Sequence, residues 1–426
     1  MTYAEAIDFL YGLRQFGTKL GLEHVQRLAD LAGSPQRGLS FIHVAGTNGK
    51  GSVCAMLEAI YRSHGLRTGL FTSPHLVAFG ERIQVNRIPL SEAGVIRLVE
   101  RLQPLLAAFA EGDHPTFFEV VTLMALIHFA EASCDVVLWE TGMGGRLDAT
   151  NLVTPLATVI TNIDMDHQRW LGNDLASIAR EKAGIIKPGV PVVTGVEQSE
   201  ARAVIEATAR SVAAPLRRVT DPLDPSRVHG GALGLAGSHQ WQNAALATAA
   251  VELLRSRWPV SSATVAKGLA EVSWPGRLQR VDLEDGRQLL LDGAHNAGGF
   301  RVLGDFLALD PAWSRPAWLV GFLEDKDRRR LWDRLRTRCS RLALVPVRSV
   351  RSAQPEEVAR EARAALPGVA VSVHASLPEA WRELREERRI VVAGSIYLIG
   401  EVMSFLGLTT HASELALNEW GPVKSG

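Results

Sequence analysis

The clearest chemical pattern in the chain lies in Gly46-Thr47-Asn48-Gly49-Lys50-Gly51-Ser52. An apolar run precedes this segment and apolar residues at helical spacing follow it, so we expect a strand, a glycine loop and a helix. Such a loop offers backbone N–H groups and a helix N-terminus to a phosphate, while Lys50 adds positive charge and Ser52 a hydroxyl. The spacing is irregular, because Gly51 separates the lysine from the serine. A plain turn with a surface lysine is the alternative, but three glycines, a lysine and a serine favour nucleotide binding.

Polar residues also follow three other predicted strands of this region. The strands and the residues after them are 67–71 with Ser73, 135–139 with Glu140, and 156–160 with His167. In a parallel sheet these ends meet at one edge, where ligands bind, and Glu140 stands where a Mg²⁺ ligand is expected. Spacing alone leaves a plain turn equally open for Ser73 and a core histidine open for His167. Lys182, in a predicted helix at 175–184, reads by spacing as an ordinary solvated lysine.

The two parts of the chain meet at a predicted hinge, Trp274-Pro275-Gly276-Arg277. Beyond it, strands alternate with helices and imply a second, mostly parallel sheet. The predicted strands are 288–291, 317–322, 342–347, 369–373 and 390–393. Three of them end in polar clusters, 292–296, 321–327 and 394–395, which we expect along one edge. The predicted fold is α/β: a P-loop ATPase domain over residues 1–276 and a smaller Rossmann-like α/β domain over residues 277–426.

Composition narrows the class of protein. Lys+Arg and Asp+Glu both number 46, so no net positive field argues for nucleic acid or an anionic membrane. Three cysteines without metal or disulfide spacing favour a reducing compartment, and Cys54 and Cys134 are expected in the core. The most apolar window, 120–130, is too short to span a bilayer. We expect a cytoplasmic protein with a loosely ordered tail after residue 409.

Two α/β domains that each carry polar clusters at strand ends suit a ligase better than a switch GTPase. A GTPase could use the same phosphate loop, but it needs no second site on another domain. A ligase must bring ATP, an acid and a nucleophile together, and closure between domains keeps water from an activated acyl group.

Together these motifs resemble the folate branch of the Mur ligase family, which contains folylpolyglutamate synthases and dihydrofolate synthases. The resemblance covers nearly the whole chain, and the irregular phosphate loop is that family's own variant. The motifs are 43–52 (HVAGTNGKGS), 72–76 (TSPHL), 144–151 (GGRLDATN), 166–167 (DH), 181–185 (EKAGI), 239–240 (HQ), 276–277 (GR), 292–296 (DGAHN) and 325–327 (DKD).

The resemblance implies roles for individual residues. It implies Mg²⁺ ligation, with two ions, by Ser73, Glu140, His167 and a Lys182 that has taken up CO₂ as a carbamate. Lys50, Lys182 and His167 would serve catalysis. Implied nucleotide contacts are Asn48, Gly49, Lys50, Gly51, Ser52, Asn243, Arg277, Asp292 and His295. Implied contacts to the pteroate or to glutamate are Thr116, Phe117, Phe118, Glu119, Leu147, Asp148, Ala149 and Lys326.

The implied reaction is ATP-dependent addition of L-glutamate to a folate carboxylate, or to dihydropteroate, through an acyl phosphate. The expected partners are these small molecules, without nucleic acid or membrane, and the expected state is a monomer. Two departures concern pteroate recognition: Gly80 stands where asparagine is expected before Glu-Arg-Ile, and the loop 18–21 fits loosely.

Two other functions remain as rivals. A Mur ligase for a wall precursor would carry a nucleotide-sugar domain before the phosphate loop, whereas only about 40 residues precede it here. A nucleotide-binding regulator would not need the set Ser73, Glu140, His167 and Lys182.

Overall fold

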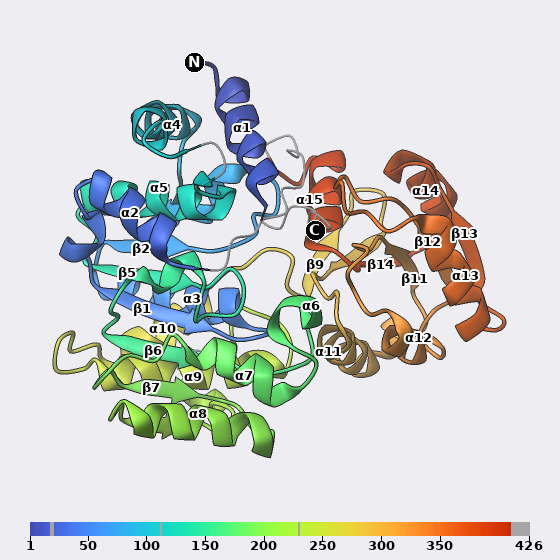
Figure 1. The fold of residues 1–426 in the computed structure, drawn as a ribbon. Helices are drawn as coiled ribbons and strands as arrows, with labels where there is room; N and C mark the ends of the chain where they lie inside the picture. Colours follow the sequence, from blue (N-terminus) through green and yellow to red (C-terminus); the bar gives the residue numbers. More distant parts are fainter. Residues whose placement is uncertain (18–20, 111–112, 229–230, 410–426) are drawn as a thin grey trace.

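The computed structural model describes residues 1–17, 21–110, 113–228 and 231–409 of the protein (Figure 1). Most of the loop 18–21 and the tail predicted after residue 409 lie outside the described residues. Figure 1 shows two α/β units side by side, the first in blue to yellow and the second in orange to red.

The first unit is built on a sheet that has eight strands in the described part of the chain. In spatial order they are β4 (Ile88–Pro89), β3 (Ile83–Val85), β2 (Thr68–Phe71), β5 (Val136–Glu140), β1 (Phe41–Ala45), β6 (Ala157–Ile160), β7 (Val192–Thr194) and β8 (Leu216–Arg218). Pairing is parallel from β2 through β8 and antiparallel at β3 and β4. The central strand β1 lies between β5 and β6, in a register that places Val44 beside Glu140 and Ala45 beside Ile160. The loops after these three strands therefore open at one edge.

Successive side chains along each strand point to opposite faces of this sheet, and each face packs in a different hydrophobic core. Phe41 and Trp139 join one cluster, whereas Ile42 and Leu138 join another. This is the period-2 pattern of a sheet covered on both faces. The helices of this unit are α1 (Tyr3–Gly12), α2 (Glu23–Leu31), α3 (Lys50–Ser63), α4 (Glu92–Leu106), α5 (Phe117–Glu131), α6 (Gln168–Leu171), α7 (Leu175–Ala183), α8 (Ser199–Ser211), α9 (His239–Leu253) and α10 (Ser262–Glu271).

The second unit has a six-stranded sheet within the described residues. Its order is β13 (Ala370–Val373), β12 (Arg341–Leu344), β11 (Ala317–Val320), β14 (Arg389–Ala393), β10 (Gln288–Leu291) and β9 (Gln279–Asp282), and only the edge strand β9 is antiparallel in these pairings. Its helices are α11 (Ala297–Ala308), α12 (Arg329–Leu335), α13 (Pro355–Ala365), α14 (Leu377–Glu383) and α15 (Ile396–Phe405). Because β10, β14 and β11 are parallel neighbours, the three polar clusters do lie along one edge, which confirms that prediction.

The predicted α/β class with mostly parallel sheets is confirmed, while several element ends differ. The strand expected over 317–322 ends at Val320, and the helix expected over 175–184 ends at Ala183. The strand expected to reach Val347 ends at Leu344, and the Val347 N–H donates to Ser352 Oγ at 2.9 Å instead of to a neighbouring strand. The segment 274–277 joins α10 to β9 without helix or strand. The domain boundary at 276/277 stays a prediction.

The most apolar segment of the chain is buried in the protein core. Helix α5 contains the apolar window and is buried on almost every side. None of the helices in the described ranges has the length and apolarity that crossing a bilayer requires. Cys54, Cys134 and Cys339 are free and buried, as expected for the first two, and burial raises the pKa of all three thiols.

Candidate active site

The phosphate loop connects β1 to α3, and its backbone requires glycine at two positions. Gly46 has φ 153° and Gly49 has φ 84°, both in the range that favours glycine. A Cβ on Gly46 would clash with the Thr161 hydroxyl, and one on Gly49 would lie 2.7 Å from Asn243 Oδ1. Lys50 begins α3, and its Nζ donates to the Gly46 carbonyl at 3.1 Å. The lysine is thus held over the loop that would receive a phosphate.

Neighbouring strands and α9 hold this loop in place. Thr161 Oγ1 donates to the Asn48 carbonyl at 2.6 Å, and the Asn48 N–H donates to Asn162 Oδ1 at 2.8 Å. On the other side, Asn243 Nδ2 donates to Gln240 Oε1 at 2.9 Å. The Asn243 amide therefore points at the loop from a fixed helix, which fits a nucleotide contact.

Two residues whose side-chain oxygens could bind a metal ion, Ser73 and Glu140, lie close together at the ends of β2 and β5. The Ser73 N–H donates to Glu140 Oε2 at 3.3 Å, and both residues line the same cavity. Ser73 Oγ is buried without a hydrogen-bond partner. A hydroxyl and a carboxylate are the oxygen ligands that Mg²⁺ prefers. The residues present therefore fit a magnesium ion, although the described residues include no cluster of three His, Cys, Asp or Glu side chains.

His167 follows β6 and caps the short helix α6 in a left-handed conformation, φ 50°. Burial, together with the nearby Lys326 ammonium, lowers its pKa to about 3. The imidazole is therefore neutral at physiological pH, which is the form that ligates metals.

Lys182 is not the solvated lysine that its spacing indicated. It lies in α7 with only 4% of the residue exposed, and its Nζ donates to the Gly46 carbonyl at 2.9 Å. Burial lowers its pKa to about 7, helped by the positive charge of Lys50. Tertiary packing has placed this amine at the phosphate loop, where a fraction is unprotonated at neutral pH.

The second unit contributes a turn after β10 that is held by its own backbone. Asp292 accepts hydrogen bonds from the Leu278 N–H at 2.8 Å and the Ala294 N–H at 2.9 Å. Burial raises the pKa of Asp292, although Arg277 opposes the shift. His295 Nδ1 lies 2.8 Å from the Gly293 carbonyl, which leaves Nε2 directed toward the first unit.

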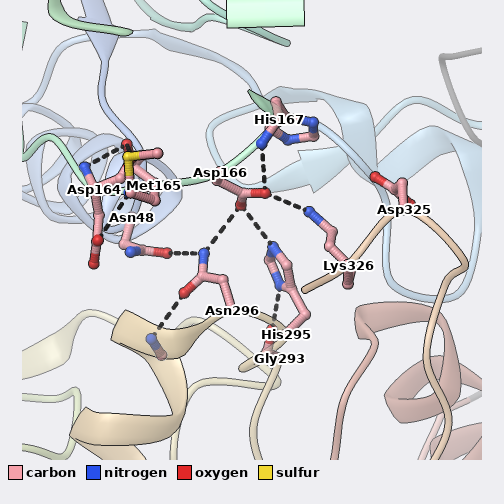
Figure 2. A network of polar contacts seen from close by, with 12 residues as sticks. Asn48, Asp164, Met165, Asp166, His167, Gly293, His295, Asn296, Asp325 and Lys326 are labelled. Carbon is pink, nitrogen blue, oxygen red and sulfur yellow. Dashed lines mark hydrogen bonds and ion pairs between the residues drawn. The ribbon is translucent and has the colours of Figure 1, made fainter. Parts of the chain in front are cut away.

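A polar network crosses between the two units at Asp166 (Figure 2). Lys326 Nζ lies 2.8 Å from Asp166 Oδ1, Asn296 Nδ2 donates to Oδ2 at 3.0 Å, and His295 Nε2 is 3.5 Å from Oδ2. Asn296 Nδ2 also donates to Asn48 Oδ1 at 3.0 Å. Burial alone would raise the pKa of Asp166, but the Lys326 charge holds it well below its usual range. A charged carboxylate thus joins the phosphate-loop unit to the second unit.

One cavity of about 430 Å³ lies where the units meet. All of the predicted nucleotide and metal residues line it, together with Lys326. They are Asn48, Gly49, Lys50, Gly51, Ser52, Ser73, Glu140, His167, Lys182, Asn243, Arg277, Asp292 and His295. The fold thus brings residues from both ends of the chain into one site.

The predicted pteroate contacts lie beside this cavity rather than on its wall. Thr116 and Glu119 form a capping box at the start of α5: the Glu119 N–H donates to Thr116 Oγ1 at 3.4 Å, and the Thr116 N–H donates to Glu119 Oε2 at 2.7 Å. Phe117, Phe118 and Ala149 belong to the hydrophobic core, Leu147 is half-buried and Asp148 caps the turn after it. Phe118 packs against Gly142, which does line the cavity. Their role toward a pteroate stays a prediction.

The departure at Gly80 has a structural reason. A Cβ at this position would clash with the Leu90 carbonyl, so asparagine cannot be accommodated in the present backbone. The adjacent Glu81 carboxylate accepts hydrogen bonds from the N–H groups of residues 76–78. The segment is therefore an internally bonded turn.

Sequence reasoning assigned no role to Asp166 or Asn296, although both lie in quoted motifs. The feature that could have identified them as site residues is their position in the chain. Asp166 follows a strand and directly precedes His167, and Asn296 caps α11. What joins them is contact across the two units, which spacing within one segment does not reveal.

A phosphate loop on one α/β unit faces an acidic and histidine-bearing sheet edge on a second unit, and both units match family profiles of the Mur ligase class. The profile of the Mur ligase middle domain matches residues 44–212, and that of the dihydrofolate synthetase C-terminal domain matches residues 279–405.

Known proteins are similar in sequence and structure to most of this chain. The dihydrofolate synthase/folylpolyglutamate synthase of Bacillus subtilis is 38% identical over 79% of this chain and 83% of its own. The folylpolyglutamate synthase of Mycobacterium tuberculosis, solved with ADP and AMPPCP, has a TM-score of 0.86 and 30% identity over 95% of this chain and 98% of its own. A bifunctional synthase solved with Mn, AMPPNP and L-glutamate has a TM-score of 0.80 and 31% identity over 94% and 98%. The chain belongs to the folylpolyglutamate synthase/dihydrofolate synthase family.

Proposed function

We propose that this protein is an ATP-dependent ligase that joins L-glutamate to the carboxylate of tetrahydrofolate, making polyglutamates, and also to that of dihydropteroate. The observation that carries the proposal is the cavity in which the phosphate loop of one unit faces Asp292, His295 and Lys326 of the other. A site divided between two units suits a reaction that must bring three substrates together.

The proposed chemistry has two steps. The substrate carboxylate attacks the γ-phosphate of ATP and gives an acyl phosphate and ADP. The amine of glutamate then attacks the acyl carbon, an amide forms, and phosphate leaves with the bonding electrons while the amine loses a proton. Lys50 and the backbone N–H groups of the loop stabilise the negative charge that gathers on the transferred phosphoryl group. The cavity walls from the two units exclude water from the activated acyl group.

Ser73, Glu140 and His167 would hold Mg²⁺, which supplies charge neutralisation on the phosphates. The unpartnered hydroxyl of Ser73 and the neutral imidazole of His167 support this assignment. Lys182 would join them as a carbamate, formed when its unprotonated amine adds CO₂ and releases a proton. Its burial at the phosphate loop supports this, because the product is an anionic oxygen donor.

Lys326 would hold the incoming glutamate, and residues 116–119 and 147–149 would receive the pteroate. The working state would be a monomer in the cytoplasm, where the three buried free cysteines are at no risk of pairing.

The decisive experiment offers purified protein ATP, L-glutamate and either tetrahydrofolate or dihydropteroate, and measures ADP and the glutamylated product. We expect glutamate-dependent ADP release with both acceptors. ADP release with tetrahydrofolate but not with dihydropteroate would show that the protein lacks dihydrofolate synthase activity. ADP release with neither acceptor would refute the proposal.

A further inference from the structure

The hairpin turn between β3 and β4 carries backbone strain at an arginine. Val85 pairs with Ile88, so the turn consists of Asn86 (φ 50°) and Arg87 (φ 67°). A two-residue turn of this kind favours glycine at its second position, because a Cβ is strained in the left-handed region. Strain of this kind persists only where surrounding contacts hold it, and strained residues cluster at functional sites.

The side chain of Arg87 makes those contacts with the segment that joins the two units. Its Nη2 donates to the Ser273 carbonyl at 2.7 Å, and its guanidinium lies 5.0 Å from the centre of the Trp274 ring. The guanidinium thus lies over the indole, in cation–π contact, and also binds the backbone beside it.

A buried carboxylate faces the same guanidinium. Glu58 of α3 is fully buried, and its Oε1 accepts hydrogen bonds from Thr68 Oγ1 and Arg62 Nε, each at 2.8 Å. Its Oε2 accepts no hydrogen bond and lies 3.9 Å from Arg87 Nε. Arg87 is therefore attached by charge to the helix that begins at the phosphate loop.

Trp274 carries this connection to the loop itself. Its indole Nε1 lies 3.1 Å from the point where a Cβ on Gly51 would stand, so the ring rests against the phosphate loop. Three residues further on, Arg277 lines the cavity, and the Gly276 carbonyl between them accepts from the Gly293 N–H at 2.9 Å. Trp274 thus lies between the loop and the Arg277 turn.

We propose that Arg87 is a positioning residue for the nucleotide, which it orders by holding Trp274 against Gly51. This inference rests on the proposed ATP-dependent function. Arg87 acts on the nucleotide site through Trp274, its ion pair with Glu58 anchors the guanidinium, and together these contacts fix the phosphate loop relative to the Arg277 turn. Glycine at this position would relieve the backbone strain but would lose the guanidinium.

A double-mutant cycle in the full-length protein tests the inference. The Kd of Mg-AMPPCP is measured by calorimetry for wild type, Arg87→Gly, Trp274→Ala and the double variant, with thermal unfolding as the check on folding. We expect Arg87→Gly to bind about tenfold more weakly, as expected for loss of a partly buried cation–π contact. The double variant should bind no more weakly than Trp274→Ala alone, because one residue acts through the other.

A conservative variant and a kinetic readout separate positioning from general destabilisation. Arg87→Lys keeps the charge opposite Glu58 but loses the forked guanidinium that contacts Trp274 and the Ser273 carbonyl together, so its Kd should fall between those of wild type and Arg87→Gly. The KM for ATP should rise while the KM for glutamate stays unchanged. An unchanged Kd in Arg87→Gly, or additive effects of the two substitutions, would overturn the inference about Arg87 but not the proposed function. A wild type that does not bind AMPPCP would overturn the proposed function with it.

Discussion

Lys326 of the second unit lies 2.8 Å from Asp166 of the first, Nζ to Oδ1, and the two side chains are only 7% and 9% exposed. Removal of one charge would leave the other charge buried without a partner, which is unfavourable. The ion pair therefore helps to hold the two units in their relative placement. Asp166 directly precedes His167, so this contact also bears on the predicted metal site.

Asp166→Asn should therefore impair turnover. The variant keeps the shape of the side chain but leaves the Lys326 ammonium without its charge partner. We expect kcat/KM to fall about 10- to 100-fold, less than the full effect of breaking a buried pair, because separation of the units lets the lysine reach water. Arg328→Met is the matched control, since Arg328 pairs with Glu361 at 2.8 Å within the second unit. Equal losses in both variants would contradict the coupling.

Lys50→Ala and Glu140→Ala should each abolish ATP-dependent amide formation, with kcat lower by about 100-fold or more. Lys50 lies over the loop and Glu140 beside Ser73, so both act where phosphate charge develops. Product formation is measured along with circular dichroism to verify folding. The control is Lys267→Ala, an exposed lysine of α10. Retained turnover in either site variant would refute its assigned role.

Lys182→Ala should lose activity and regain part of it when a short carboxylic acid is added. The acid would occupy the space of the proposed carbamate and supply an anionic oxygen near the metal ligands. Rates are compared with and without acetate. Lys187→Ala serves as the control, because Lys187 is partly buried and donates to the Asn151 carbonyl at 3.2 Å. Full activity of Lys182→Ala without additive would remove the carbamate from the mechanism.

Glu401 should make the stability of the protein fall as pH rises. Burial raises its pKa to about 7, although its carboxylate accepts the Arg348 N–H at 2.6 Å. The folded state then binds more protons than the unfolded chain between about pH 4.5 and 7. The favourable contribution is complete below about pH 4.5 and is lost as pH rises through 7.

Glu401→Gln removes that titration, so the variant should be more stable than wild type at pH 8, by up to about 3 kcal/mol, and similar at pH 4.5. Urea unfolding at the two pH values measures the difference. Glu284→Gln, at an exposed turn, controls for the loss of one negative charge. A difference between Glu401→Gln and wild type that is equal at both pH values would show that burial does not perturb this carboxyl.

Local patterns predicted most of the framework. The apolar run before Gly46, the glycines after it and the helical spacing beyond are all local features, and they correspond to β1, the loop and α3. The ends of elements were less predictable, as at Val320 and Leu344, because apolar residues such as Phe322 and Val345 continue beyond the strand and pack in the hydrophobic cores. Strands as short as Leu216–Arg218 carry too few residues for a periodicity.

The sequence by itself determined the class of fold, the phosphate loop and the polar residues at strand ends, since each depends on neighbours within a few residues. Only the tertiary structure decided which of these residues meet. Lys182 looked like a solvated helix lysine, yet packing buries it beside Gly46, 136 positions away in the chain. Asp166 and Lys326, 160 positions apart, become partners in the same way. Burial and long-range charge, which shift pKa values and hold the two units together, are properties of packed space and leave no local pattern.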